Sequence, residues 1–246
     1  MNAKRPLIAV LTGAGISTDS GIPDYRGPQG LWRRDPSAEE LVTIGPYRGD
    51  PQVRERAWRM RLETAELAAE PNAGHRALVD LERSGLPLRV LTQNIDGLHQ
   101  RAGLTDRKVL ELHGNVRETQ CLDCRAVGSM ARALDRVEAG EPDPDCRECG
   151  GILKPRIVMF GENLDQEVLG RADTIARACD LFIAVGTSLQ VFPVAGLPYE
   201  AVRSGAKLII VNGEETPYDV AAAEVIREPI STALPELVRR LVRERA

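Results

Sequence analysis

The sequence contains no hydrophobic run long enough to cross a membrane. None of its 246 residues lies in an apolar stretch approaching the ~20 residues that a spanning helix needs. The apolar run at residues 7–11, which follows Lys4 and Arg5, is also too short for the hydrophobic region of a signal peptide. Internal repeats and low-complexity tracts are absent. We therefore expect a globular protein that stays in the cytoplasm and has no membrane partner.

An excess of positive charge is lacking as well. The chain carries 32 basic and 36 acidic residues, a formal net charge of −4, so no specific nucleic-acid partner is expected. Five arginines are nevertheless concentrated in one short stretch, where they predict either a solvated helix face or a contact with a ligand: Arg48, Arg54, Arg56, Arg59 and Arg61.

Cysteines are few, and a cytoplasmic protein is not expected to join them as disulfides. Four of the five form two C-x-x-C pairs, Cys121 with Cys124 and Cys146 with Cys149, with 21 residues between the pairs. Two such pairs can supply the four thiolates of a tetrahedral zinc site. That site would be structural, because no position stays open for a reactant; a redox pair or chance are the alternatives. Cys179, beside an apolar run, is expected to be a small buried residue.

A dinucleotide-binding turn begins after residues 7–11 but lacks its last glycine. Gly13-Ala14-Gly15 opens the G-x-G-x-x-G pattern, and Thr18 occupies the place of the third glycine. The acidic residue expected about 20 residues later, which would bind a ribose, is missing too. Asn212 and Glu214, at the end of a later predicted strand, could take its place. The pattern therefore predicts a dinucleotide site that has been modified.

Apolar runs alternate with amphipathic segments along most of the chain, which predicts an α/β fold with a parallel sheet and helices on both faces. Residues 28–70 and 117–156 interrupt this alternation and look like insertions. The predicted strands are residues 7–11, 88–92, 109–112, 181–185 and 207–211; the predicted helices are 73–84 (capped by Asn72), 166–178, 194–204 and 231–245 (capped by Ser231).

Polar residues follow each of these predicted strands. Because carboxyl ends of parallel strands share one edge of a sheet, these segments should converge there: Gln93-Asn94-Ile95-Asp96, His113-Gly114-Asn115, Gly186-Thr187-Ser188 and Asn212-Gly213-Glu214. Among the three histidines, His113 is best placed to act as a general base, with a turn or capping role as the alternative. His75 and His99 lie in predicted helices and are expected to be structural.

Taken in order, these motifs resemble those of the sirtuins, the NAD-dependent protein-lysine deacylases of bacterial type. The resemblance extends over nearly the whole chain and includes Gly21-Ile22-Pro23-Asp24-Tyr25-Arg26 and Val158-Met159-Phe160-Gly161-Glu162. It implies a Rossmann-like NAD-binding domain formed by residues 1–27, 71–116 and 157–246. It also implies a smaller domain made of a helical module, 28–70, and a four-cysteine zinc module, 117–156, with the substrate held between the two domains.

The resemblance also implies roles for individual residues. His113 and Asn94 would be catalytic, and acyl-lysine peptides would pair with the segments around Val158 and Val191, with Phe160 lining the acyl channel. NAD would be bound by Gly13, Ala14, Gly15, Thr18, Asp24, Tyr25, Arg26, Gln93, Ile95, Asp96, Gly186, Thr187, Ser188, Asn212 and Glu214.

The implied reaction consumes NAD and involves no hydride transfer. Nicotinamide leaves, the acyl-lysine oxygen captures the ribose carbon, and a ribose hydroxyl deprotonated by His113 then attacks, so that the acyl group passes to ADP-ribose. The alternatives are a mono-ADP-ribosyltransferase, an NAD(P)-linked oxidoreductase and a non-catalytic zinc-ribbon adaptor that senses NAD.

Two positions depart from the family pattern. Tyr25 stands where phenylalanine is usual. Trp58 and Arg61 align with the Tyr-x-x-Arg of members that remove succinyl or malonyl groups, so an indole replaces the phenol while the guanidinium is kept. We therefore expect an enzyme that removes acetyl groups and in addition accepts acidic or longer acyl groups if Arg61 contacts them.

Overall fold

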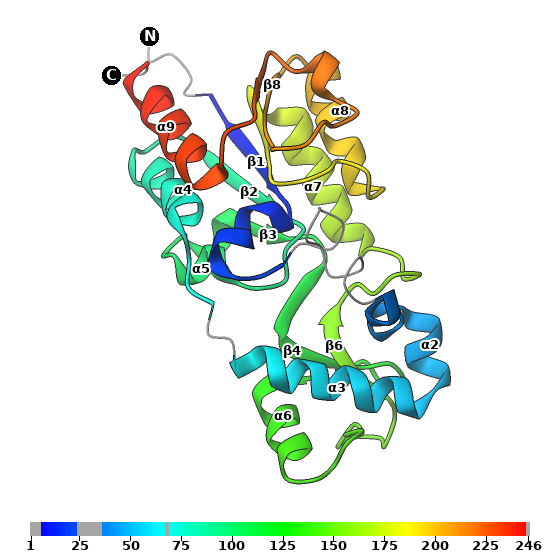
Figure 1. The fold of residues 1–246 in the computed structure, drawn as a ribbon. Helices are drawn as coiled ribbons and strands as arrows, with labels where there is room; N and C mark the ends of the chain where they lie inside the picture. Colours follow the sequence, from blue (N-terminus) through cyan, green and yellow to red (C-terminus); the bar gives the residue numbers. More distant parts are fainter. Residues whose placement is uncertain (1–5, 24–35, 67–68, 245–246) are drawn as a thin grey trace.

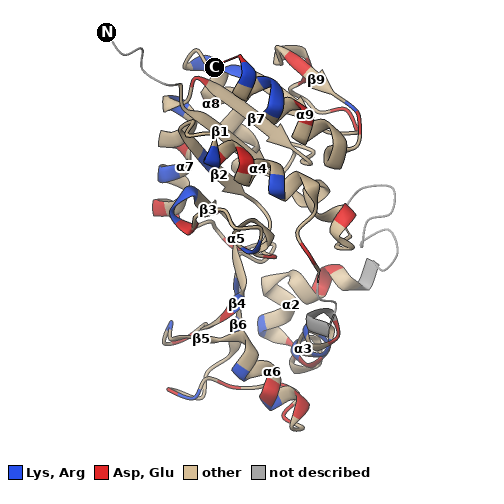
Figure 2. Ribbon diagram, turned by 90° about the vertical axis from the view of Figure 1, so that its left-hand side faces the viewer, with Lys and Arg blue, Asp and Glu red and all other residues tan. Residues whose placement is uncertain are grey.

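The computed structural model describes residues 6–23, 36–66 and 69–244. A large part built on a parallel sheet lies above a smaller part in Figure 1. Over the described residues, no helix combines the length and the apolar character needed to cross a membrane. Basic and acidic residues are interspersed over both parts (Figure 2).

The large part contains a six-stranded sheet in the order β3-β2-β1-β7-β8-β9, in which all paired strands are parallel. Its central strands are almost wholly buried, as expected for apolar runs covered on both faces. Their bounds are β1 Ile8–Thr12, β2 Leu88–Thr92, β3 Val109–Glu111, β7 Leu181–Val185, β8 Lys207–Val211 and β9 Glu224–Ile226.

Helices cover both faces of this sheet, which confirms the predicted α/β class. On one face α4 (Ala73–Arg83) and α9 (Ile230–Arg243) pack through Leu78 and Leu234 against Val10. On the other, α7 (Gln166–Ala178) and α8 (Leu197–Arg203) pack against alternate residues of the same strands. Shorter elements connect them: η1 Ala14–Ser20, α5 Leu98–Arg101, η3 Asp106–Lys108, η4 Val194–Gly196 and η5 Asp219–Ala221.

Helix α9 begins one residue earlier than predicted. Its N-cap is Pro229, and Ser231 lies within the first turn and does not cap the helix. Asn72, in contrast, caps α4 as predicted, because its side chain accepts hydrogen bonds from the amides of Gly74 and His75. The predicted helix at 194–204 is divided into η4 and α8.

The small part combines a three-stranded antiparallel sheet, in the order β5-β4-β6, with helices from an earlier region of the chain. Tyr47 and Ala57 from that region share one core with Ile157 and Met159, while Trp58 shares another with Met130. The helical and cysteine-containing segments are therefore packed as one unit. The bounds are η2 Pro36–Val42, α2 Ile44–Gly49, α3 Pro51–Glu66, β4 Gly114–Cys121, β5 Val127–Ser129, α6 Met130–Glu138 and β6 Leu153–Ile157.

Strands β4 and β6 connect the two parts (Figure 2). Where β4 begins, Gly114 has a φ of +77°, and a Cβ there would lie 2.1 Å from the carbonyl oxygen of Arg156. Only glycine fits this close crossing, which lies directly after His113.

Candidate active site and metal centre

The turn after β1 packs directly against the turn after β7. Gly13 and Gly15 donate their amides to the carbonyls of Val185 and Gly186, at 3.0 and 2.9 Å. A Cβ on Gly13 would lie 2.6 Å from the Gly186 oxygen, and a Cβ on Gly186 would lie 2.4 Å from the Ile16 nitrogen. Close contact between the two backbones therefore requires glycine at these positions. That Gly13 and Gly15 also bind phosphate stays a prediction.

His113 is half-buried and lies two residues after β3, directly before β4. Its Nδ1 is 3.0 Å from the carbonyl oxygen of Gln93. Because a carbonyl only accepts, Nδ1 carries the proton and Nε2 has a free lone pair. Burial lowers the pKa of His113 below its usual 6.5, with the Gln93 bond opposing. The imidazole is therefore neutral at pH 7 and oriented as a base.

Ser17, Asn94 and Asp96 meet in a polar cluster at the same edge of the sheet. The Ser17 hydroxyl donates to the Asp96 carboxylate at 2.8 Å and accepts from the Asn94 amide at 3.1 Å. The second Asp96 oxygen accepts from the amide of Leu98 at 2.9 Å. Two of the predicted residues are thus held together by a serine that was not among the predicted site residues.

Two buried histidines lie beneath this cluster. The rings of His75 and His99 are 5.1 Å apart. His75 Nε2 lies 3.4 Å from the Ser17 hydroxyl, and its Nδ1 accepts from the amide of Asn72, so Nε2 is the protonated nitrogen. Nε2 of His99 lies 2.9 Å from the Thr12 hydroxyl. Burial lowers the pKa of His75 to about 4 and that of His99 to about 3.

The remaining predicted NAD residues lie along the same edge. The side-chain amide of Gln93 donates to the Thr187 hydroxyl at 2.9 Å, which links the ends of β2 and β7. Ser188 and Ile95 are half-buried. Ala14 and Thr18 lie in η1, where the Thr18 hydroxyl donates to the carbonyl of Gly15. The predicted nicotinamide-covering residues, Asp24, Tyr25 and Arg26, lie outside the described residues.

The loop after β8 is organised by an arginine that sequence reasoning missed. Arg227 donates to the carbonyls of Asn212 and Glu214, at 2.7 Å each, and pairs with Asp219. The Asn212 side chain donates to the Glu214 carbonyl at 2.9 Å. The Glu214 side chain itself is exposed, so this residue contributes to the loop chiefly through its backbone.

The expected peptide-binding segment adjoins His113. The amide of Val158 donates to the carbonyl of His113 at 2.9 Å, and the Phe160 amide donates to Val42 at 2.9 Å. Phe160 is 36% exposed, a large fraction for an aromatic side chain. Val191, from the other expected segment, is half-buried and precedes an exposed phenylalanine, Phe192.

Trp58, which aligns with the tyrosine of the Tyr-x-x-Arg pattern, lies on the face of α3 that packs against α6. Its side chain has no exposed surface and packs with Met130, Ala133 and Leu153 between α3 and the cysteine-containing segment. This placement argues against a contact between its indole and a substrate. Arg61 is also buried, and it donates to the Ala57 carbonyl at 2.7 Å. The arginines of α3 therefore do not all lie on a solvated face, because Arg61 is buried.

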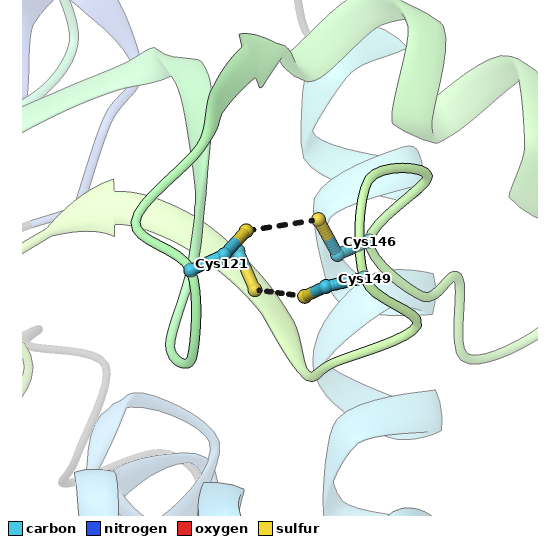
Figure 3. A group of neighbouring side chains, drawn as sticks. Cys121, Cys146 and Cys149 are labelled. Carbon is cyan, nitrogen blue, oxygen red and sulfur yellow. Dashed lines mark hydrogen bonds between the residues drawn. The ribbon is translucent and has the colours of Figure 1, made fainter.

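The four cysteines of the two C-x-x-C pairs converge. Figure 3 shows Cys121, at the end of β4, opposite Cys146 and Cys149. The four sulfur atoms all lie within 4.8 Å of one another, with Cys121 to Cys149 at 3.5 Å and Cys124 to Cys146 at 3.6 Å. Four thiolates around a tetrahedral Zn²⁺ would be about 3.8 Å apart, given Zn–S distances of about 2.3 Å. The sulfur cluster therefore fits zinc, and it leaves no ligand position for a reactant. Cys179 is buried at the end of α7, as predicted.

Comparison with known proteins identifies the fold and the site. A family model described as the Sir2 family matches residues 13–193. The chain belongs to the Sir2 family. NAD-dependent protein deacetylase 2 of Streptomyces coelicolor is 64% identical over 237 residues, which cover 96% of this chain and 98% of that protein. NAD-dependent protein deacylase 2 of Archaeoglobus fulgidus is 44% identical over 247 residues, covering 99% and 94%.

Solved sirtuin structures superpose on this one over nearly its whole length. A Sir2 protein with a p53 peptide and NAD⁺ has a TM-score of 0.82 at 41% identity, covering 97% of this chain and 92% of that chain. Sir2Tm bound to a propionylated peptide has a TM-score of 0.81 at 40% identity, with the same coverage. This sirtuin is an NAD-dependent protein deacetylase or deacylase with a four-cysteine site that fits zinc.

The side chains at the sheet edge suit the NAD that a sirtuin consumes. Asp96 and Asn94 offer both acceptors and donors, which match a carboxamide and ribose hydroxyls. They are held by Ser17 and backed by His75, so their orientation is set before a ligand arrives. Ser17 could have been suspected from its place in the Gly13–Ser17 motif, whereas no sequence signal linked His75 to it.

Proposed function

We propose that this sirtuin deacylates lysine side chains of proteins, with His113 as the general base and Asn94 and Asp96 positioning NAD. The observation that supports this assignment is the hydrogen bond from His113 Nδ1 to the carbonyl of Gln93, the residue before Asn94, which leaves Nε2 unprotonated. When bound, NAD supplies an electrophilic ribose carbon as nicotinamide departs.

His113 would take a proton from a ribose hydroxyl at Nε2 and later return it to a leaving group. Its lowered pKa keeps that nitrogen free at neutral pH, and the Gln93 carbonyl can stabilise the imidazolium once it forms. Asp96 would hold the carboxamide, because its carboxylate is fixed by Ser17 on one oxygen and by Leu98 on the other. Gln93 and Asn94 would orient the ribose.

The remaining NAD residues would hold the rest of the cofactor. We assign the phosphates to the turn of Gly13, Ala14 and Gly15 with Ser188, and the adenosine ribose to the loop of Asn212 and Glu214. Thr187 would orient the side chain of Gln93, because its hydroxyl accepts a hydrogen bond from the Gln93 amide. Asp24, Tyr25 and Arg26 would cover the reacting ribose, and residues 28–70 and 117–156 would form the small domain.

The substrate would be an acyl-lysine peptide that adds as a strand alongside residues 158–160 and 191–193. Two observations support this placement: relatives were solved with a p53 peptide and with a propionylated peptide, and Phe160 is exposed where its segment meets His113. A cytoplasmic location would suit the thiols of the zinc site.

Arg61 would be the residue that meets an acidic acyl group, because it lies on the same helix as Met60, which packs with Ile95 and Met159 in one core. Arg61→Ala should then lower desuccinylation more than deacetylation. Arg59→Ala, an exposed arginine of the same helix, is the matched control. Equal effects of Arg61→Ala on both activities would contradict this role.

The test is mass spectrometry of acetyl-, propionyl- and succinyl-lysine peptides incubated with NAD. We expect peptide deacylation, nicotinamide release and acylated ADP-ribose in equal amounts, and loss of all three in His113→Ala. A peptide that gains the mass of ADP-ribose would instead indicate a transferase. Full turnover by His113→Ala would refute the proposed base.

A further inference from the structure

A buried lysine lies directly behind the proposed peptide-binding segment. Lys154 belongs to β6 and is 3% exposed. Its ammonium donates to the Ile157 carbonyl at 2.6 Å and to Glu162 Oε2 at 2.7 Å. Burial lowers the pKa of Lys154, and the Glu162 carboxylate opposes that shift.

The same oxygen of Glu162 also fixes the backbone of the segment. Glu162 Oε2 accepts from the amide of Met159 at 2.9 Å, and the Glu162 amide donates to the Met159 carbonyl at 3.0 Å. These bonds close a tight turn in which Gly161 has a φ of +85°. One carboxylate thus joins the buried ammonium to the turn.

The rest of the segment is held by the two parts of the molecule. Val158 donates to His113, and Phe160 exchanges backbone bonds with Val42 and Ile44 at 2.9 Å each. The Lys154–Glu162 pair adds a support at the point where residues 158–161 change direction. It therefore helps to set which backbone and side-chain groups the segment presents beside His113.

Stability alone does not explain an ion pair at this position. Removing an ammonium from water costs several kcal/mol, and apolar residues of similar volume often replace buried ion pairs without loss. Leu153 and Ile157, neighbours of Lys154 on β6, are buried apolar residues. A methionine at 154 would continue that pattern, but it would leave the Ile157 carbonyl and Glu162 without their donor.

We propose that Lys154 and Glu162 are positioning residues for the peptide substrate, acting through the backbone of residues 158–161. They touch neither NAD nor the acyl group. This inference rests on the proposed placement of the peptide. It predicts a selective effect on peptide binding, which a general supporting role in the fold would not produce.

The test is steady-state kinetics of the full chain with an acetyl-lysine peptide and NAD, using Lys154→Met, Glu162→Gln and Lys154→Arg. Each of the first two should raise the peptide KM about tenfold, the loss expected when a charged hydrogen-bond partner is removed. The KM for NAD and the zinc content should stay at wild-type values. Lys154→Arg keeps the charge and should restore the peptide KM to within about threefold.

Arg156→Met is the matched control, because it removes an ion pair with Glu118 from the same strand but on an exposed side. It should leave both KM values unchanged. An unchanged peptide KM in Lys154→Met and Glu162→Gln would overturn the proposal. So would a parallel loss of kcat, NAD affinity and melting temperature in both. If Lys154→Met fails to fold, Glu162→Gln with direct peptide titration decides. Inactivity of the wild-type enzyme on every acyl peptide would instead refute the proposed function.

Discussion

The hydroxyl of Ser17 donates a hydrogen bond to the carboxylate of Asp96, and the two oxygens lie 2.8 Å apart. The same hydroxyl accepts from Asn94. With its proton committed to Asp96, Ser17 must act as an acceptor toward both Asn94 and the Nε2–H of His75. Ser17 therefore sets Asp96 as an acceptor and Asn94 as a donor toward it, and both residues are proposed to hold NAD.

Ser17→Ala should impair use of NAD. Loss of a hydrogen bond to a charged group costs about 1.5–3 kcal/mol, so kcat/KM for NAD should fall about 10- to 100-fold while the peptide KM is unchanged. Steady-state kinetics with each substrate varied in turn measures this. Ser204→Ala, an exposed serine after α8, is the control. A rise in the peptide KM alone would contradict the assignment.

The pH dependence of the reaction should follow the lowered pKa of His113. Since the neutral imidazole is the active form, kcat/KM should persist as the pH falls to 6.5 and decline only below that value. His113→Ala should lose about 10²- to 10⁴-fold in rate. A fall in kcat/KM on the acid side that is centred above pH 7 would exclude His113 as the base. So would the same fall in the residual activity of His113→Ala.

His99 should make the fold sensitive to acid. Its pKa is about 3 in the folded protein and 6.5 when unperturbed, so between these pH values the unfolded chain binds the additional proton. Stability should therefore decrease as the pH falls, by up to about 1.4 kcal/mol per pH unit from this residue. In His99→Gln, urea titrations between pH 6.5 and 4 should show a slope lower by one proton. Zinc content measured at each pH shows whether metal loss contributes, and an unchanged slope would contradict the linkage.

Removal of zinc should expose Trp58. This indole is packed between α3 and α6, directly beside the cysteine-containing segment. Because the sequence has two tryptophans, the measurement uses Trp32→Phe, which leaves Trp58 as the only one. Chelation should shift its fluorescence to longer wavelength, and Cys124→Ser should show the shifted spectrum without chelator. Emission that stays unchanged after zinc loss has been verified would disprove the coupling.

Gly186→Ala should destabilise the sheet edge. The residue has a φ of +60°, and a Cβ would lie 2.4 Å from the Ile16 nitrogen, so we expect a loss of about 2–4 kcal/mol. Denaturant titration measures the change. Gly170→Ala is the control and should not destabilise, because a methyl group added to this glycine of α7 would meet nothing within 4 Å. Equal stabilities of the two variants would show that the turns after β1 and β7 can separate.

Local sequence signals predicted the main sheet well. β2, β7 and β8 have the predicted bounds because each is an apolar run that needs no distant partner to be recognised. β9 was not predicted because it has only three residues and begins with a glutamate. β6 was not predicted because it contains Lys154, and a lysine does not indicate a buried strand. Its ammonium is paired with Glu162, a contact that forms only in the folded turn.

The site was predictable as a set of strand-end residues but not as a network. His113, Asn94 and Asp96 stood out because polar residues after parallel strands share one edge. Ser17 lies 79 residues from Asp96 in the chain, and no local pattern specifies that contact. The burial of Trp58 against α6 was not predictable, because helical spacing gives the position of a residue along α3 but does not say which neighbour each face meets.

The crossing between the two parts has a mechanical consequence. Gly114 and Ile157 pair where β4 leaves and β6 returns, and the next bond, from Val158 to His113, lies at the same point. These bonds join the start of β4, the end of β6 and the proposed peptide-binding segment directly to the backbone of His113 and its neighbour. Residues 158–160 therefore cannot shift away from His113 without breaking the bond from Val158 to its carbonyl.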